Sequence, residues 1–371
     1  LVSTSKDFST RLPANSSGAK HTVKLSVSDG RQLSSKERVL LVDPDQLYAV
    51  SRLNAKVKGV VYWPDCNVPR IGWALKEQYI RSDMNLIRDE LGCNGIRINS
   101  GVCGPSYSQE WEKELVRCAE VAIEIGFETI RLGPRYMDAT LEETVEKVRA
   151  FAARAEKLRE VSDAIVFEVG NELSVDAQGI CETTHGYGAR TREFDEKSVP
   201  WNPAHSEYQK RLNDLLRRLV AAARESYRGK LSYAAHPGEW GIPWDELDFD
   251  IVGQNQYWWP ECSGDQEFVE ILRQRRTYGK PVHVTEFGCT SYQGSFELGG
   301  RAYQYTGVYD EDAQATGIRH YLELMNAGKA DGCFLFKFRD TGAEPPSRYS
   351  LIDEAHRKKS FYMYKAYQRP P

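Results

Sequence analysis

The sequence has no long apolar run, no glycine-rich phosphate-binding motif and no strong charge of either sign. No apolar stretch approaches the roughly 18–20 residues of a membrane span, so we expect no membrane association. The 49 Lys and Arg against 53 Asp and Glu leave a net charge of −4 over 371 residues, a balance that argues against nucleic acid as a partner. Neither GxGxxG nor a Walker A motif is present, and we expect no cofactor.

The eight cysteines include no CxxC pair and are spread too widely for a disulfide scaffold. Cys93, Cys289 and Cys333 lie in or beside apolar runs, where a free thiol behaves as a small hydrophobic side chain. We therefore expect reduced cysteines and favour a cytoplasmic location slightly over a secreted one. Cys181 and His185, four residues apart, have no further ligand set beside them, so we expect no metal site.

Residues 1–55 differ in pattern from residues 56–371. In the first segment, Thr22–Val27 alternates with period two, a turn follows at Asp29 and Gly30, and a second apolar run covers Glu37–Val42. This pattern predicts a small β-hairpin appendage. In the second segment, short β-rich runs alternate with longer stretches of helical periodicity. The predicted strands are Lys58–Trp63, Gly95–Asn99, Glu128–Leu132, Ala164–Gly170, Lys230–Ala235, Asp250–Tyr257, Pro281–Phe287 and Asp331–Phe338.

Eight strands with helical crossovers favour an α/β protein with a closed (β/α)8 TIM barrel over residues 56–371. The alternative is an open doubly wound sheet, which usually carries a glycine-rich turn after its first strand. Here the first strand ends at Trp63 and Pro64 instead. The link from His236 to Phe249 is short, so we expect its helix to be vestigial.

Strand alternation predicts an unusually polar barrel interior. Ile96 and Ile98 would face the helices, which turns Arg97 inward. The same reasoning turns Arg131, Glu168, Lys337 and Arg339 inward, and places Phe334, Phe336 and Phe338 on the helix side. We interpret Arg131, Glu168 and Lys337 as a buried ion network, because isolated buried charges are costly. For Arg97, a network role and a site role are equally open.

Two glutamates end predicted strands at the edge where TIM-barrel enzymes place catalysis. Glu172 follows the fourth strand and Glu286 the seventh. Two carboxylates across a pocket are the equipment of glycoside hydrolysis, in which one protonates the leaving oxygen and the other attacks the anomeric carbon. The alternative is that each caps the helix that follows, since acidic side chains suit helix N-termini.

Asn171–Glu172 and Thr285–Gly288 resemble motifs of the retaining glycoside hydrolases of clan A, the superfamily with catalytic glutamates on strands four and seven. The resemblance covers about residues 56–368 and implies that Glu172 is the acid/base and Glu286 the nucleophile. It further implies that Asn171 binds the sugar 2-hydroxyl, that Arg97 and Tyr257 support the nucleophile, and that His236 lies near the site. Residues 285–289 also resemble barrel proteins labelled abortive-infection proteins.

Strand eight departs from the clan pattern, because it has no tryptophan to form the floor of the sugar site. Lys337 and Arg339 stand there instead, and would accept a carboxylate or phosphate of the substrate. The alternative is neutralisation by Glu168, Asp340 or Glu286. Trp63 and Trp258 lie where flat rings suit sugar faces. The segment 174–203 is predicted to be a loop that covers the barrel mouth.

The sequence thus predicts a hydrolase of carbohydrate metabolism, a retaining β-glycosidase whose partner is a small-molecule or oligosaccharide substrate. One alternative is an isomerase, lyase or cyclase that reuses Glu172 and Glu286 as general acid and base, because fold alone does not fix function. Another is a carbohydrate-binding barrel without catalysis, although the presence of both glutamates speaks against it.

Overall fold

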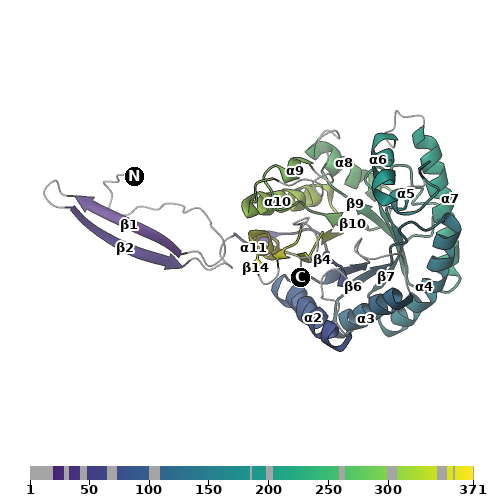
Figure 1. Cartoon of the computed structure of the whole chain (residues 1–371), viewed down its shortest axis with the longest axis horizontal. Helices are drawn as coiled ribbons and strands as arrows, with labels where there is room; N and C mark the ends of the chain where they lie inside the picture. The colour runs from purple at the N-terminus through teal and green to yellow at the C-terminus, as the bar shows by residue number, and fades with distance from the viewer. Residues whose placement is uncertain are drawn as a thin grey trace.

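Eight parallel strands close into a barrel in the computed structural model (Figure 1). The structure describes residues 48–64, 73–99, 109–183, 186–197, 204–258, 264–298, 307–340, 349–353 and 356–370, and the backbone of two strands before them. The barrel strands are β4 (Val57–Tyr62), β5 (Gly95–Asn99), β6 (Thr129–Gly133), β7 (Ile165–Asn171), β8 (Lys230–Ala235), β9 (Ile251–Asn255), β10 (Val282–Phe287) and β11 (Gly332–Leu335). The predicted TIM barrel is confirmed, and the open sheet is excluded because β11 pairs with β4.

Helices surround the barrel, and a large apolar core fills the layer between them and the strands. The helices are α2 (Trp73–Asn85) with the π-helical turn η2 (Leu86–Glu90), α3 (Gln109–Ile125), α4 (Leu141–Val161), α5 (Leu173–Asp176), α6 (Tyr187–Lys197), α7 (Ala204–Arg224), α8 (Asp265–Arg276), α9 (Ser295–Leu298), α10 (Glu311–Gly328) and α11 (Lys359–Ala366). Two helices have clear start signals. Thr140 and Glu143 form a capping box before α4, and Asp310 caps α10 through the amides of Asp312 and Ala313.

Two predictions about the connections have different outcomes. Residues 236–249 form turns without a helix, as expected. The segment 174–203 is not the predicted loop, because it contains most of α5 and all of α6. Arg190 on α6 is fully buried and donates to the main-chain oxygens of Val175 and Asp176, which fixes α6 against α5. His185 and residues 198–203 lie outside the described residues.

Strand β11 turns Phe334 the opposite way to the prediction, whereas Phe338, beyond the strand, lies in the core between the strands and the helices as predicted. Phe334 packs inside the barrel with Val61 and Trp63, and the Arg131 guanidinium lies 5.7 Å from its ring centre. The ring fits because two neighbouring positions are glycine: a Cβ on Gly59 would lie 2.6 Å from a Phe334 ring carbon, and one on Gly95 3.1 Å. The prediction was wrong because it reserved the interior for polar residues, whereas a barrel of this size is filled by packed side chains.

Short strands join the two ends of the barrel domain. β3 (Ser51–Arg52) pairs in parallel with β15 (Tyr367–Gln368), and the Leu53 amide donates to the Gln368 oxygen at 2.8 Å. Before them, β1 (Lys20–Ser28) and β2 (Leu33–Leu41) form an antiparallel sheet of their own, which confirms the predicted hairpin. Beside the mouth of the barrel, β12 (Arg339–Asp340), β13 (Ile352–Asp353) and β14 (His356–Arg357) form a further sheet.

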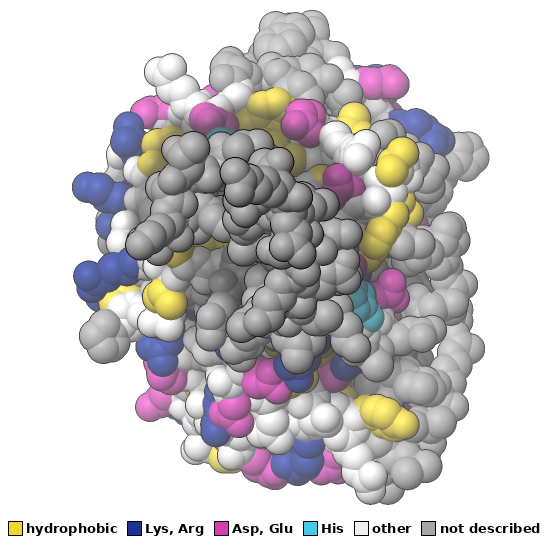
Figure 2. Space-filling view, turned by 90° about the vertical axis from the view of Figure 1, so that its left-hand side faces the viewer, with side chains coloured by type: hydrophobic (Ala, Val, Ile, Leu, Met, Phe, Trp, Pro, Cys, Tyr) yellow, Lys and Arg dark blue, Asp and Glu magenta, His cyan; other side chains and the backbone are white. Residues whose placement is uncertain are grey.

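Acidic and basic side chains lie interspersed on the face shown in Figure 2, without a large area of one sign among the described residues visible there. This mixture agrees with the near-neutral composition. In the part of the chain that the structure describes, no helix combines the length and the apolarity needed to cross a membrane.

Candidate active site

Glu172 stands directly after β7 in a conformation that non-glycine residues rarely adopt. Its φ is 42° and its ψ is 51°, the left-handed region, which costs roughly 1–2 kcal/mol for a residue with a Cβ. This left-handed conformation turns the chain sharply from β7 into the short helix α5. Its amide donates to the Ala234 oxygen on β8 at 2.9 Å. The sharp turn is therefore anchored to the neighbouring strand.

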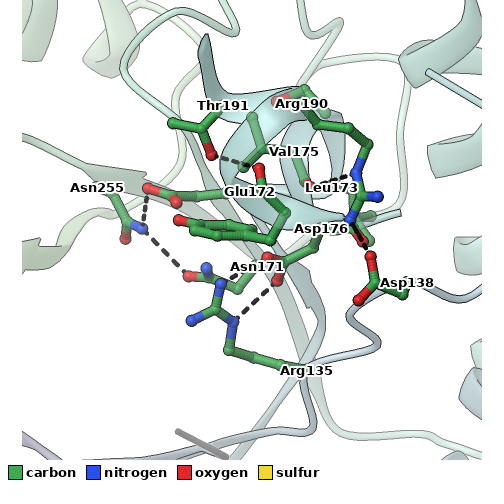
Figure 3. A network of polar contacts seen from close by, with 12 residues as sticks. Arg135, Asp138, Asn171, Glu172, Leu173, Val175, Asp176, Arg190, Thr191 and Asn255 are labelled. Carbon is green, nitrogen blue, oxygen red and sulfur yellow. Dashed lines mark hydrogen bonds and ion pairs between the residues drawn. The ribbon is translucent and has the colours of Figure 1, made fainter. Parts of the chain in front are cut away.

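The Glu172 carboxylate is held by an amide from β9. Asn255 Nδ2 donates to Glu172 Oε1 at 2.8 Å and to Asn171 Oδ1 at 3.1 Å, so one side chain orients both residues of the Asn-Glu pair (Figure 3). Beside this pair, Arg135 binds both carboxylate oxygens of Asp176. Burial raises the pKa of Glu172 above its ordinary value, and the Asn255 hydrogen bond opposes the shift only in part.

Glu286 lies in β10 and is bound by two of the side chains that the sequence assigned to it. Arg97 Nη1 lies 2.5 Å from Oε1, and the Tyr257 hydroxyl donates to Oε2 at 3.2 Å. Burial raises the pKa of Glu286, Arg97 opposes the rise, and the charge of Glu172 adds to it. Because the charge of Glu172 reaches Glu286, the two glutamates belong to one site.

Arg97 links this site to the ion network inside the barrel. Its guanidinium also donates to Glu168 at 2.8 Å and to Asn171 Oδ1 at 2.8 Å. Arg131 takes the other Glu168 oxygen at 2.5 Å, and further contacts Ser232 and His283. The predicted network is confirmed for Arg131 and Glu168, whereas the contacts described for the third member, Lys337, are with the rings of Trp63 and Phe336. Arg97 takes part in both the network and the site.

His236 directly follows β8, within reach of the charge of Glu286. Its Nδ1 accepts a hydrogen bond from the Gly238 amide at 3.0 Å, so the ring proton sits on Nε2. Burial lowers the pKa of His236, and the negative charges of Asp195, Asp176 and Glu286 oppose this. The ring packs edge-on against Phe194 at 5.1 Å.

Comparison with known proteins identifies the family of the chain. A family model described as Glycoside Hydrolase Family 113 matches residues 159–365, more than half of the chain. The chain belongs to glycoside hydrolase family 113. The family lies in clan A, so the resemblance drawn from the sequence is confirmed. No curated protein matches the chain.

Solved structures share the fold at low identity. A GH113 β-1,4-mannanase is 17% identical with a TM-score of 0.59, covering 84% of this chain and 98% of its own. The GH113 β-mannanase of Alicyclobacillus acidocaldarius, in complex with ManMIm, is 15% identical with a TM-score of 0.55, at 84% and 96% coverage. A GH5-4 broad-specificity endoglucanase from Clostridium acetobutylicum is 13% identical with a TM-score of 0.55, again at 84% and 96%.

The two cations of strand eight differ in their surroundings in this family 113 chain. Arg339 is paired with Asp83 on α2, with Nη2 2.5 Å from Oδ1, and Asp83 also accepts from the Tyr62 hydroxyl. The sequence named Glu168, Asp340 and Glu286 as partners, and missed Asp83 because it is 256 residues away along the chain. Lys337 is buried, and its Nζ lies 4.6 Å from the ring centre of Trp63.

A series of aromatic side chains in contact runs from Trp63 to Tyr257, which binds Glu286. Trp63 meets Phe336 edge-on at 5.0 Å, Phe336 meets Tyr349 at 5.4 Å, and Tyr349 meets Tyr257 at 6.5 Å. Phe336 is half-buried, so part of its ring remains accessible. Trp258 instead packs on Phe296 at 5.3 Å, where it supports the rim.

Several residues around the glutamates were not predicted from the sequence. Asn255 could have been found, because it lies two positions before Tyr257 and shares its face by alternation. Arg135, Asp176, Tyr187 and Tyr349 lie in loops or at helix ends, where no periodic pattern marks them. Tyr187 packs under Arg135, whose guanidinium is 5.5 Å from its ring centre, and its pKa is raised by burial and by Glu172.

Among the described residues, no group of His, Cys, Asp and Glu is arranged to hold a metal ion. Cys181 is buried and its thiol donates to the main-chain oxygen of Ser174 at 3.3 Å, while His185 lies outside the described part. The five described cysteines are all free and buried: Cys93, Cys118, Cys181, Cys289 and Cys333.

Proposed function

We propose that this chain hydrolyses β-1,4-linked mannosides with retention of configuration, with Glu172 as acid/base and Glu286 as nucleophile. The observation that carries the proposal is the asymmetry of the two interacting carboxyls. Glu286 is paired with a guanidinium and a hydroxyl, whereas the hydrogen bond described at Glu172 comes from a neutral amide. A bound arginine favours the charged form, which a nucleophile needs. At Glu172, burial raises the pKa by more than Asn255, Arg135 and Arg97 lower it, which favours the protonated form that an acid needs.

In the first step, Glu286 would attack the anomeric carbon while the Glu172 proton passes to the leaving oxygen. The product is a covalent glycosyl-enzyme and a free alcohol. Glu172, now ionised, would then take a proton from water, whose oxygen displaces Glu286. This chemistry requires the two carboxyl groups to lie about 5–5.5 Å apart, and a separation near 9 Å would correspond to inversion.

Asn171 is suited to bind the sugar 2-hydroxyl. Its Oδ1 already accepts from Arg97 and Asn255, so the amide orientation is fixed and Nδ2 is left to donate. A donor fixed in this way strengthens its bond as charge develops at the sugar ring. Strand eight has no tryptophan to pack against the sugar. The exposed part of Phe336 offers an aromatic face in its place.

The mannoside assignment is supported by family membership and by the β-mannanases among the similar structures. The test compares the rates of hydrolysis of mannohexaose, cellohexaose and β-1,4-galactan. The anomeric configuration of the first product is read by ¹H NMR. We expect mannohexaose to be preferred and the first product to be the β-anomer. Preference for another glycan would correct the substrate and leave the mechanism in place.

The mechanism is tested by trapping. A 2-deoxy-2-fluoro-β-mannosyl fluoride should add one sugar to the protein, with the label on the peptide that contains Glu286. Glu286→Gln should remain unlabelled, and Glu172→Ala should regain turnover of an activated aryl mannoside with azide, giving a β-mannosyl azide. An unlabelled wild-type protein that still converts a sugar would favour the isomerase, lyase or cyclase alternative.

A further inference from the structure

A buried carboxyl that the proposed chemistry does not use lies behind the Glu172 turn. Glu239 is 1% exposed and sits in the turn that follows β8. After the Glu172 amide, which bonds to β8, the next two amides also point to this region. The Leu173 amide donates to the Tyr233 hydroxyl at 2.7 Å, and the Ser174 amide donates to Glu239 Oε1 at 3.1 Å.

The Glu239 carboxylate is the common acceptor of these contacts. Ser174 donates through its hydroxyl as well, at 2.5 Å, and the His236 amide donates to Oε2 at 2.8 Å. The Tyr233 hydroxyl lies 2.8 Å from Oε2. Because its oxygen accepts from Leu173, its hydrogen is available for Glu239. The Glu239 carboxylate therefore accepts four hydrogen bonds.

We propose that Glu239 is a positioning residue: together with Tyr233 it holds Glu172 in its left-handed conformation and so fixes the direction of the Glu172 carboxyl. The proposal rests on the proposed function only in that Glu172 is taken as the acid/base. Glu239 also accepts from the main-chain amide of His236, the residue that follows β8. One carboxylate thus joins the segments that follow β7 and β8.

The turn is held by contacts from several neighbouring elements, and Tyr233 and Glu239 are the acceptors of its Leu173 and Ser174 amides. The helix that follows Glu172 has only four residues, so it supplies few hydrogen bonds of its own. A left-handed residue persists only where its surroundings determine the conformation. Without an acceptor for the Ser174 and Tyr233 donors, the backbone is free to relax toward ordinary angles, and the Glu172 carboxyl would move with it.

The electrostatic setting is consistent with this role. Burial raises the pKa of Glu239 to about 7, while the hydrogen bonds from Ser174, Tyr233 and His236 favour the ionised form. The buried Arg275 binds the main-chain oxygen of Glu239 at 3.3 Å. The Glu239 carboxylate therefore depends on its hydrogen-bond donors for stabilisation, and they depend on it.

The first test measures the turn itself and needs no activity. Glu239→Gln replaces one acceptor oxygen by a donor, and Tyr233→Phe removes the link to Leu173. We expect amide hydrogen exchange in the peptide covering residues 172–176 to accelerate at least about tenfold in both variants, because the Leu173 amide loses its acceptor in Tyr233→Phe, the Ser174 amide loses the carboxylate in Glu239→Gln, and the turn opens more often in each. The matched controls are Glu246→Gln, exposed in the same loop, and Tyr227→Phe, a buried hydroxyl that binds Ile165 at the other end of β7.

The second test separates positioning from general stability. A displaced acid slows only leaving groups that need a proton, so kcat/KM for a phenyl β-mannobioside should fall by about 10- to 100-fold. For the 2,4-dinitrophenyl mannobioside, which leaves unprotonated, it should fall by less than about threefold. A structural defect, or any loss of folded protein, would lower kcat/KM equally for both substrates.

The outcomes are distinct for the two proposals. Unchanged exchange at residues 172–176 in folded Glu239→Gln and Tyr233→Phe overturns the positioning role, whatever the activity. Failure of both variants to fold would assign Glu239 to the stability of the whole barrel and also overturn it. Altered exchange in a wild-type protein that cleaves no mannoside would leave the positioning role standing and reject the proposed function.

Discussion

Arg97 carries one charge but is shared by two carboxylates and an amide. Glu168 and Glu286 both lie within 2.8 Å of its guanidinium nitrogens, and the planar fork of arginine allows these contacts at once. A lysine would provide the charge without the fork. The residue therefore contributes both to the ion network and to the state of the nucleophile, and these two contributions can be separated by mutation.

Replacing Arg97 by methionine should move the acid limb of the pH profile. Arg97 opposes the rise in the pKa of Glu286 that burial causes, so its removal raises that pKa further. Since Glu286 must be ionised to react, kcat/KM should begin to fall at a pH about one unit higher or more, and turnover at neutral pH should drop more than about tenfold. The measurement is kcat/KM for mannohexaose between pH 4 and 9.

Arg131→Met is the matched control for this prediction. This substitution also removes a guanidinium group from Glu168. The contacts described for Arg131 are with Glu168, His283 and Ser232, and none is with Glu286. Both variants should lose stability, and only Arg97→Met should shift the acid limb. Equal shifts in the two variants would show that the effect comes from the network as a whole.

At the scale of elements, β11 shows how a glycine on one strand sets the side-chain direction of another. The space beside Gly59 and Gly95 accepts the Phe334 ring and thereby settles which face of β11 points inward. Leu335 then joins the outer core, and Phe338, beyond the strand, packs on Tyr62 at 6.3 Å. Alternation within β11 predicts the pattern but not its phase.

Gly59→Ala should destabilise the fold by about 1–3 kcal/mol, because the new methyl group overlaps the Phe334 ring. Adding Phe334→Leu should recover part of the loss but not all, since the Gly95 oxygen would still lie 2.8 Å from the new carbon. Urea unfolding measures both. Gly188→Ala, on α6 in open space, should instead gain up to about 1 kcal/mol. Equal effects at Gly59 and Gly188 would contradict the packing argument.

How much the sequence could predict depended on whether a feature is local. The bounds of β5 and β8 agree with the predicted ranges, because strong periodic runs end at clear breaks. The contacts of Glu286 with Arg97 and Tyr257 follow from strand ends that meet at one edge. The Arg339 and Asp83 pair and the Glu239 cluster join segments without a shared pattern, so only the folded chain reveals them.

At the scale of the whole molecule, the ion network in the barrel interior connects β5, β6, β7 and β10. Burial alone would raise the pKa of Glu168, but Arg97 and Arg131 outweigh it and lower the pKa below its ordinary value. A carboxyl with a lowered folded pKa stabilises the protein above its unfolded pKa of about 4.3, and this contribution is lost as pH falls through the folded value. The network therefore favours folding at neutral pH.

Glu168→Gln should lower the free energy of unfolding by about 3–5 kcal/mol at pH 7, because two buried guanidinium groups lose their shared carboxylate. The difference from wild type should shrink below about pH 4, where Glu168 begins to be protonated in the unfolded chain. Urea unfolding at several pH values measures this, with Glu246→Gln as the exposed control. A deficit that stays constant down to pH 3 would show that packing, not charge, is responsible.

The pairing of β3 with β15 has a consequence for the connectivity of the chain. Residues 51–52 and 367–368 are hydrogen-bonded neighbours, so a short linker could join them without crossing the barrel. The chain could then be reopened at Gly279, an exposed turn with nothing within 4 Å of its Cβ position. Such a circular permutant would keep every barrel strand and both glutamates while changing the order in which they are synthesised. For this fold, the order of strands around the ring matters, and the place where the chain is cut does not.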